Sequence, residues 1–142
     1  MTGILKISEA ASLALHTAVL LAIKEDKVFS TGEIAREIKV SEAHLSKVLQ
    51  RLTRAGVVQS LRGPKGGFKL ARSPDEITLL QVYEALEGSL APKGCLFESR
   101  ICGTGDCILG GLIAGVNNQV GEYLAKTKLS DLTHVYSFME RR

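Results

Sequence analysis

The sequence has no tryptophan, few other aromatic residues and no long apolar run, and each absence excludes a class of protein. Four Phe and three Tyr make up 5% of its 142 residues, which is little for a protein that stacks single-stranded bases on aromatic rings. No run approaches the roughly 20 apolar residues of a membrane-spanning helix. The first ten residues, MTGILKISEA, lack the charged start, apolar centre and cleavage site of a signal peptide. We therefore expect a cytoplasmic protein with no membrane partner.

Arrangements typical of enzymes are missing too. The sequence has no Cys–His–Asp constellation, no Gly-rich phosphate loop and no pair of carboxylates at a suggestive spacing. We therefore predict that the protein is not an enzyme. Its length suits one domain with an extension, and 45% hydrophobic residues are enough for a core.

Residues 41–54 have the pattern of a DNA-recognition helix. Its apolar residues, at spacings of three, four and seven, fall on one face: Leu45, Val48, Leu49 and Leu52. Ser41 is a good N-cap and Gly56 a good helix stop. The cap and the other face carry groups that can meet phosphates or base edges, namely Ser41, His44, Ser46, Lys47, Gln50, Arg51 and Arg54. By itself the helix could equally be a solvated amphipathic helix with a basic face.

The flanking segments favour the DNA-binding interpretation. Ser30 and Glu33 fit a capping box, so a short helix precedes the turn at residues 39–41, as in a helix-turn-helix. After the recognition helix, residues 57–61 and 68–71 predict two strands joined by the turn GPKGG, with Arg62, Lys65 and Gly66 near its tip. We predict a mainly α fold with a small two-stranded β wing, which is a winged helix-turn-helix.

The charge is concentrated in this region. Residues 31–73 hold nine Lys and Arg against three Glu, a net charge of +6, whereas the whole chain is +3. Such an asymmetry indicates a local surface for a polyanion.

Four further helices are expected outside this unit. Ser8 can cap a helix through residue 23 that is apolar on nearly every side and therefore buried. Thr78 and Gln81 form a second capping box, which opens a helix that ends at Gly88. A long helix from near Asp106 has an apolar stripe with no layer to cover it, so we predict that it crosses its twin in a homodimer. We assign residues 1–89 to the DNA-binding domain, 90–106 to a cysteine-bearing sensor loop, and 107–142 to the dimerisation helix and a short C-terminal helix capped by Ser130.

The cysteines are Cys95, Cys102 and Cys107, separated by six and four residues in the predicted loop. They could be buried thiols, although a polar loop is a poor place to bury them. A structural disulfide is disfavoured in a reducing compartment and by the odd number. Zinc, a thiol redox switch and an iron–sulfur cluster all remain open, since thiolates ligate both metals.

The segments EIKVSEAHLSKVLQRL, AGVVQSLRGPKGGF and ITLLQVYEALEG carry a family resemblance. They resemble the IscR-, NsrR- and CymR-type bacterial transcription regulators (the Rrf-two superfamily), and the match runs from about Ser8 to the C-terminus. This resemblance implies a dimer that reads a pseudo-palindromic double-stranded DNA operator and most often represses transcription.

The resemblance also implies that the three cysteines ligate an iron–sulfur cluster, 2Fe–2S or 4Fe–4S. The chain departs from IscR-like members in two respects: their spacing is usually five and five, and Gly110 stands where they have a histidine. NsrR-like members take a carboxylate from the first helix of the other subunit. Here that position is Ser12, with Glu9 and His16 one turn away, so these three are the candidates for a fourth ligand. His16 could instead be a core histidine bonded to a carbonyl.

We therefore predict a homodimeric winged-helix regulator that senses redox state, nitric oxide or iron–sulfur status through the cluster. The alternative is a cluster-free CymR-like regulator, controlled by thiol oxidation or by a protein partner. An RNA-binding or pure interaction module is a third hypothesis. A preference for one duplex operator that persists at high salt would exclude it.

Overall fold

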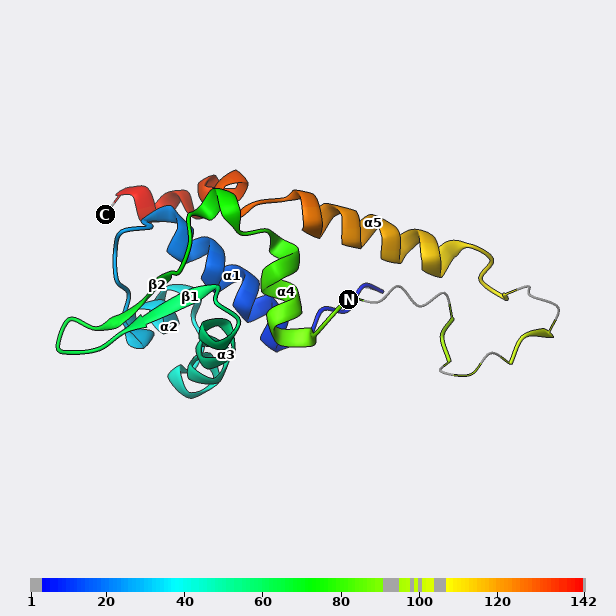
Figure 1. The fold of residues 1–142 in the computed structure, drawn as a ribbon, viewed down its shortest axis with the longest axis horizontal. Helices are drawn as coiled ribbons and strands as arrows, with labels where there is room; N and C mark the ends of the chain where they lie inside the picture. The colour runs from blue at the N-terminus through cyan, green and yellow to red at the C-terminus, as the bar shows by residue number, and fades with distance from the viewer. Residues whose placement is uncertain (1–3, 91–94, 98, 100, 104–106, 142) are drawn as a thin grey trace.

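The chain is mainly helical and carries one two-stranded antiparallel ribbon (Figure 1). The computed structural model describes residues 4–90, 95–97, 99, 101–103 and 107–141. In chain order its elements are α1 (Glu9–Ile23), α2 (Thr31–Ile38), α3 (Glu42–Arg54), β1 (Val58–Leu61), β2 (Gly67–Leu70), the 3-10 turn η1 (Pro74–Glu76), α4 (Leu79–Glu87), α5 (Leu112–Lys126) and the 3-10 segment η3 (Leu129–Arg141).

Helices α2 and α3 form the predicted helix-turn-helix, and local hydrogen bonds set their limits. The Ser30 hydroxyl accepts from the Glu33 backbone N–H at 3.1 Å, and the Glu33 carboxylate accepts from the Ser30 backbone N–H, so the predicted capping box is confirmed. Lys39 ends α2 in the left-handed conformation, at φ 58°. Ser41 caps α3 by accepting from the His44 backbone N–H at 3.2 Å. These caps satisfy backbone donors that the first helical turn leaves unpaired.

The predicted wing is confirmed as a hairpin, with Val58 opposite Leu70 and Leu61 opposite Gly67. Phe29 forms an isolated antiparallel bridge with Phe68 of β2, through two backbone hydrogen bonds of 2.9 and 2.7 Å. Gly67 permits this close approach, because a Cβ atom at that position would lie 2.3 Å from the Phe29 carbonyl oxygen. The bridge ties the base of the wing to the segment before α2.

Helix α1 lies at the centre of the core, between α3, α4 and η3. Leu20 and Leu21 of α1 pack among the buried stripe of α3 and the inner residues of α4, Leu79, Val82 and Leu86. The sequence-based expectation that α1 is buried almost all round needs one correction. His16 is exposed, and its Nδ1 donates to the Ser12 backbone carbonyl at 2.6 Å, so it is not a core histidine.

The C-terminal part differs from the prediction in two ways. The long helix begins at Leu112 rather than near Asp106, which itself lies outside the described residues. The last segment is a 3-10 helix with a break at Tyr136, and Asp131, not Ser130, provides the local cap by accepting from the Lys128 backbone N–H at 2.9 Å. Two glycines, Gly110 and Gly111, disfavour an earlier start of the helix.

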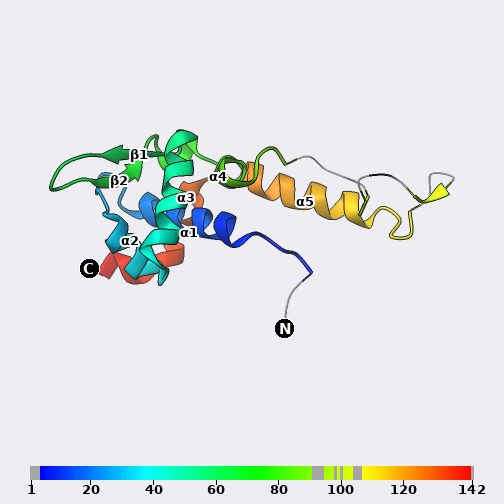
Figure 2. The ribbon, with the colours of Figure 1, turned by 90° about the horizontal axis from the view of Figure 1, so that it is seen from below.

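A backbone bridge anchors the end of α5 on the DNA-binding unit. The Leu79 N–H donates to the Thr127 carbonyl at 2.9 Å, and the Leu129 N–H donates to the Ile77 carbonyl at 3.0 Å. From this anchor α5 projects away from the core. The wing and the far end of α5 therefore lie at opposite ends of the molecule (Figures 1 and 2). Among the described residues, no helix combines the length and apolar character needed to cross a bilayer.

Candidate DNA-binding surface and cysteine loop

The outward face of α3 is exposed and polar. Its apolar stripe is buried, as predicted, and this leaves Lys47, Gln50 and Arg54 exposed on the opposite side. Ser41 is exposed at the N-terminal end of the helix, and Ser46 is half-buried beside the stripe. In Figure 1, α3 and the wing lie along one edge of the molecule, whereas α5 and η3 lie along the other. Helix α3 and the wing thus lie on the side of the molecule away from α5 (Figure 1).

His44 and Arg51 occupy a different side of α3. They are seven residues, or about two turns, apart, so they share one flank of the helix. The His44 imidazole lies 3.8 Å from the Glu9 carboxylate of α1. The Arg51 guanidinium donates to the backbone carbonyl of Leu86, in the last turn of α4. Sequence reasoning placed both side chains on the DNA-reading face, and the structure gives each of them a partner within the chain.

The wing tip presents Arg62 and Lys65 to solvent, and Gly66 is half-buried behind them. Gly66 closes the turn by donating its N–H to the Gly63 carbonyl at 2.9 Å. A Cβ atom on Gly66 would lie 2.3 Å from the Leu61 carbonyl oxygen, so glycine is required for this tight reversal. The turn therefore holds two cations at an exposed tip.

The three cysteines are free thiols, and all are half-buried. The Phe97 N–H donates to the Sγ of Cys95, and the Leu109 N–H donates to the Sγ of Cys107, each at 3.5 Å. Backbone donors of this kind stabilise a thiolate and tune a metal that it binds. A set of three such thiolates fits the chemistry of an iron–sulfur cluster or of zinc. In the described part of the chain, however, no three Cys, His, Asp or Glu side chains gather as a metal site would require.

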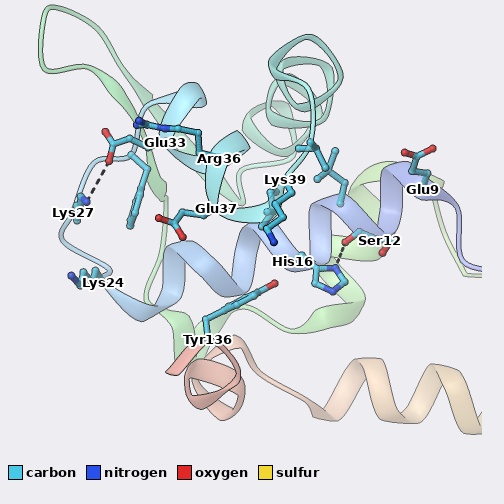
Figure 3. Close-up of a pocket in the computed structure, with 14 residues that line it drawn as sticks. Glu9, Ser12, His16, Lys24, Lys27, Glu33, Arg36, Glu37, Lys39 and Tyr136 are labelled. Carbon is cyan, nitrogen blue, oxygen red and sulfur yellow. Dashed lines mark hydrogen bonds and ion pairs between the residues drawn. The ribbon is translucent and has the colours of Figure 1, made fainter. Parts of the chain in front are cut away.

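The candidates for a fourth ligand lie elsewhere in the monomer. Glu9, Ser12 and His16 line one end of a groove of about 1020 Å³ between α1, α2 and Tyr136 (Figure 3). The described segments 95–97, 101–103 and 107–111, which carry the cysteines, lie beyond the N-terminal end of α5, away from α1 (Figure 1). The structure therefore brings together the three candidates from α1 but does not bring them to the cysteines of the same chain.

Helix α5 keeps an apolar side exposed. The exposed fractions are 60% for Leu112, 41% for Val116 and 58% for Tyr123, whereas Leu124 is buried against the domain. Exposed apolar residues at this helical spacing form a continuous surface, which is typical of an interface.

The family model for Rrf2, an iron-dependent transcriptional regulator, matches residues 7–135. The chain belongs to the Rrf2 family. It is 30% identical over 131 residues to an Aquifex aeolicus protein named as an HTH-type transcriptional regulator, a match that covers 90% of this chain and 91% of the relative. The protein is thus a helix-turn-helix transcriptional regulator and not an enzyme.

Solved structures agree with this assignment of an Rrf2 fold. CymR, the global cysteine regulator of B. subtilis, is 31% identical and superposes with a TM-score of 0.78, over 93% of this chain and 98% of CymR. T. potens IscR is 26% identical, with a TM-score of 0.71 over 90% and 85% of the two chains. The winged helix-turn-helix that the sequence predicted is therefore confirmed.

Sequence reasoning missed the two contacts on the flank of α3 and the groove beside α1. Neither contact leaves a local signal, because Glu9 and Leu86 are far from their partners in the chain. The exposed flank of α3 is also as polar as its outward face, so residue type does not separate the two.

Proposed function

We propose that this Rrf2-family chain acts as a homodimeric repressor that binds a pseudo-palindromic DNA operator and senses its signal through the cysteine loop. The exposed apolar side of α5 carries the dimer part of the proposal. A second α5 would cover Leu112, Val116 and Tyr123. The backbone bridge at Thr127 keeps each α5 fixed to the DNA-binding unit of its own chain.

DNA binding would use the outward face of α3 and the wing. We assign Lys47 and Gln50 to the major groove, with Ser41 and Ser46 near the N-terminal end of the helix and His44 at its flank. Arg62, Lys65 and Gly66 of the wing would reach the adjacent minor groove or backbone. In a two-fold symmetric dimer the half-sites are expected about 34–36 Å apart, or at a multiple of one helical turn.

The cysteine loop would hold an iron–sulfur cluster through Cys95, Cys102 and Cys107. The two backbone N–H donors at Cys95 and Cys107 support this assignment. Bound there, the cluster would supply an exchangeable iron site at which a small molecule or an oxidant reacts. Because the described segments that carry the cysteines lie away from α1 within one chain (Figure 1), Glu9, Ser12 or His16 of the partner subunit would provide a fourth ligand. A change in the loop would then act through α5 and alter the relative orientation of the two DNA-binding units in the dimer.

One observation favours a second candidate function. The described cysteines are not gathered into a ligand set, and the fold superposes closely on that of CymR. A CymR-type regulator controlled by thiol oxidation or a protein partner would need no metal. It would keep the same DNA-binding surface and the same dimer helix.

Three measurements test this proposal. The duplex that the protein selects from a random-sequence pool should contain an inverted repeat, and light scattering should give the mass of a dimer. Protein purified without oxygen should be brown, with near-equal iron and acid-labile sulfide. A colourless dimeric protein that still selects a duplex would leave the thiol-based alternative, whereas failure to select any duplex would contradict the assigned DNA contacts.

A further inference from the structure

The C-terminal end of α4 is a junction between three parts of the chain. The Leu86 carbonyl accepts from the Arg51 guanidinium of α3. The Ser8 hydroxyl, which caps α1, donates to the Glu87 carboxylate. The Leu90 N–H, where the chain leaves α4 toward the cysteines, donates to the Glu84 carboxylate at 3.2 Å. One helical turn therefore contacts the recognition helix, the start of the core helix and the beginning of the loop.

The contact from Arg51 is chemically favourable at this position. The last four carbonyls of a helix have no partner within the helix, and the C-terminal end carries a partial negative charge. A guanidinium that donates to the Leu86 carbonyl satisfies one of these groups and is attracted by the helix dipole. The side chain also reaches across the α3–α4 contact, and the two helices lie side by side in both views (Figures 1 and 2).

Arg51 differs from the other cations of α3 in this respect. Lys47, Arg51 and Arg54 are all exposed. The side chains of Lys47 and Arg54 make no ion pair or hydrogen bond with the described residues, whereas Arg51 donates to the Leu86 carbonyl. Arg51 lies on the flank that it shares with His44 and is engaged within the chain. The bond to the Leu86 carbonyl uses one of the five N–H donors of the guanidinium and holds the group against the end of α4.

We propose that Arg51 is a positioning residue that fixes the recognition helix to the end of α4, and does not itself read or bind DNA. This inference rests on the proposed use of α3 as the reading helix. On this proposal the α3–α4 junction sets the orientation of α3, and therefore the operator specificity. The residues that follow α4 can then change operator affinity by moving the end of α4, without touching the DNA.

The first test separates positioning from phosphate contact. Arg51→Met removes the donors while keeping a side chain of similar length, and Lys47→Met removes one charge from the outward face of the same helix. Affinity is measured against salt concentration, for the duplex selected by the wild-type protein and for a random-sequence duplex. Each lost phosphate contact lowers the slope of log affinity against log salt by about 0.9, so one substitution, present in both subunits of a dimer, lowers it by about 1.8. We expect that fall for Lys47→Met. For Arg51→Met we expect an unchanged slope, about tenfold weaker binding of the selected duplex and little change for the random one.

The second test asks whether Arg51 acts through α4. Gly88 ends α4 at φ 79°, a conformation that favours glycine, and a Cβ atom there would meet nothing within 4 Å. Gly88→Ala therefore strains the end of α4 without a clash. Contacts in one network are not additive. If both residues act through this junction, the affinity of the double variant for the selected duplex should therefore be within about twofold of that of the single variant with the lower affinity.

Three results would overturn the inference. The Arg51→Met slope could fall as far as that of Lys47→Met, which would make Arg51 a phosphate contact. The folded Arg51→Met protein could melt earlier yet bind the selected duplex as tightly as the wild type, which would make its role purely stabilising. The losses of the two single variants could multiply in the double variant, which would exclude a shared route through α4. Failure of the wild-type protein to select any duplex is a different result, because it contradicts the proposed function itself.

Discussion

The Nδ1 atom of His44, on the recognition helix, lies 3.8 Å from the Oε1 atom of Glu9, in the first turn of α1. The pair joins a predicted DNA contact to a predicted cluster ligand. It is an ion pair only when the imidazole is protonated, and the Glu9 side chain is 84% exposed. Solvent screens such a pair strongly, so Glu9 remains available to another partner.

We predict that the Glu9–His44 pair contributes little to stability. A double-mutant cycle with Glu9→Gln and His44→Gln should give a coupling free energy below about 0.5 kcal/mol, as is usual for exposed pairs. Urea denaturation at pH 6 and at pH 8 measures it. A coupling free energy well above 1 kcal/mol would mean that Glu9 binds His44 strongly. Glu9 would then no longer be a candidate for the fourth cluster ligand.

We predict that a charge on the exposed side of α5 separates the dimer. Val116→Glu should give a monomer by light scattering, because burying an unpaired carboxylate at an interface is costly. The monomer should stay folded, since Leu124, Leu129 and the backbone bridge hold α5 on its own domain. Its affinity for the selected duplex should fall to that of a single half-site.

The matched control for the dimer is Asn118→Glu. Asn118 is exposed on the same helix, about 200° from Val116 around its axis, so the same charge is added away from the apolar side. This variant should remain a dimer. Equal dissociation by both variants would indicate general repulsion, and a dimer for both would place the interface elsewhere.

We predict that the cysteines act as one ligand set. Cys95→Ala, Cys102→Ala and Cys107→Ala should each abolish the visible absorption of protein purified without oxygen, and each should lower iron and sulfide together. Glu9→Gln and His16→Gln should shift the spectrum rather than abolish it if either residue is the fourth ligand. A visible spectrum that survives all three cysteine substitutions would contradict thiolate ligation.

We predict a small, pH-dependent contribution from Glu33 at the start of α2. Burial acts to raise the pKa of Glu33, but hydrogen bonds from the Ser30 backbone and from Lys27, whose ammonium lies 3.3 Å away, outweigh it and lower the pKa below its ordinary 4.5. A lowered pKa stabilises the folded protein above pH 4.5, and this stabilisation is lost as the pH falls through the folded-state value.

Glu33→Gln measures the contribution of this charge, because glutamine can keep the capping box. The wild type should be more stable than this variant by no more than about 0.5 kcal/mol at pH 7, since the pair is exposed. The difference should shrink and vanish as the pH falls below 4.5. Ser30→Ala, which removes the cap itself, should cost about 1 kcal/mol at each pH. A Glu33→Gln deficit that grows on acidification would contradict the assigned direction of the pKa.

The interactions that sequence reasoning predicted are those between near neighbours in the chain. Both capping boxes, at Ser30–Glu33 and Thr78–Gln81, form as expected. The caps at Ser8 and Ser41, the hairpin and the buried stripe of α3 follow from residue type at fixed short spacing. The family resemblance rested on the same segments, and the Rrf2 match confirms it.

The start of α5 and the form of the last segment were predicted wrongly. For α5, the reason is that the apolar pattern begins before the first residue that is helical. Leu109 fits the helical stripe, yet it lies in a turn before Gly110 and Gly111. Apolar periodicity reports which side could be buried, and does not by itself decide where hydrogen bonding begins.

By itself, the sequence determined the winged helix-turn-helix, the basic outward face of α3 and the membership of a regulator family, because caps, turns and helical faces depend on nearby residues. Only the tertiary structure decided which cation of α3 contacts another helix. Arg51 and Lys47 are both exposed cations of the same helix, but Arg51 alone of the two donates to the end of α4, 35 residues along the chain. The packing of α3 against α1 and α4 sets that difference, because it brings the Leu86 carbonyl within reach of one flank of the helix.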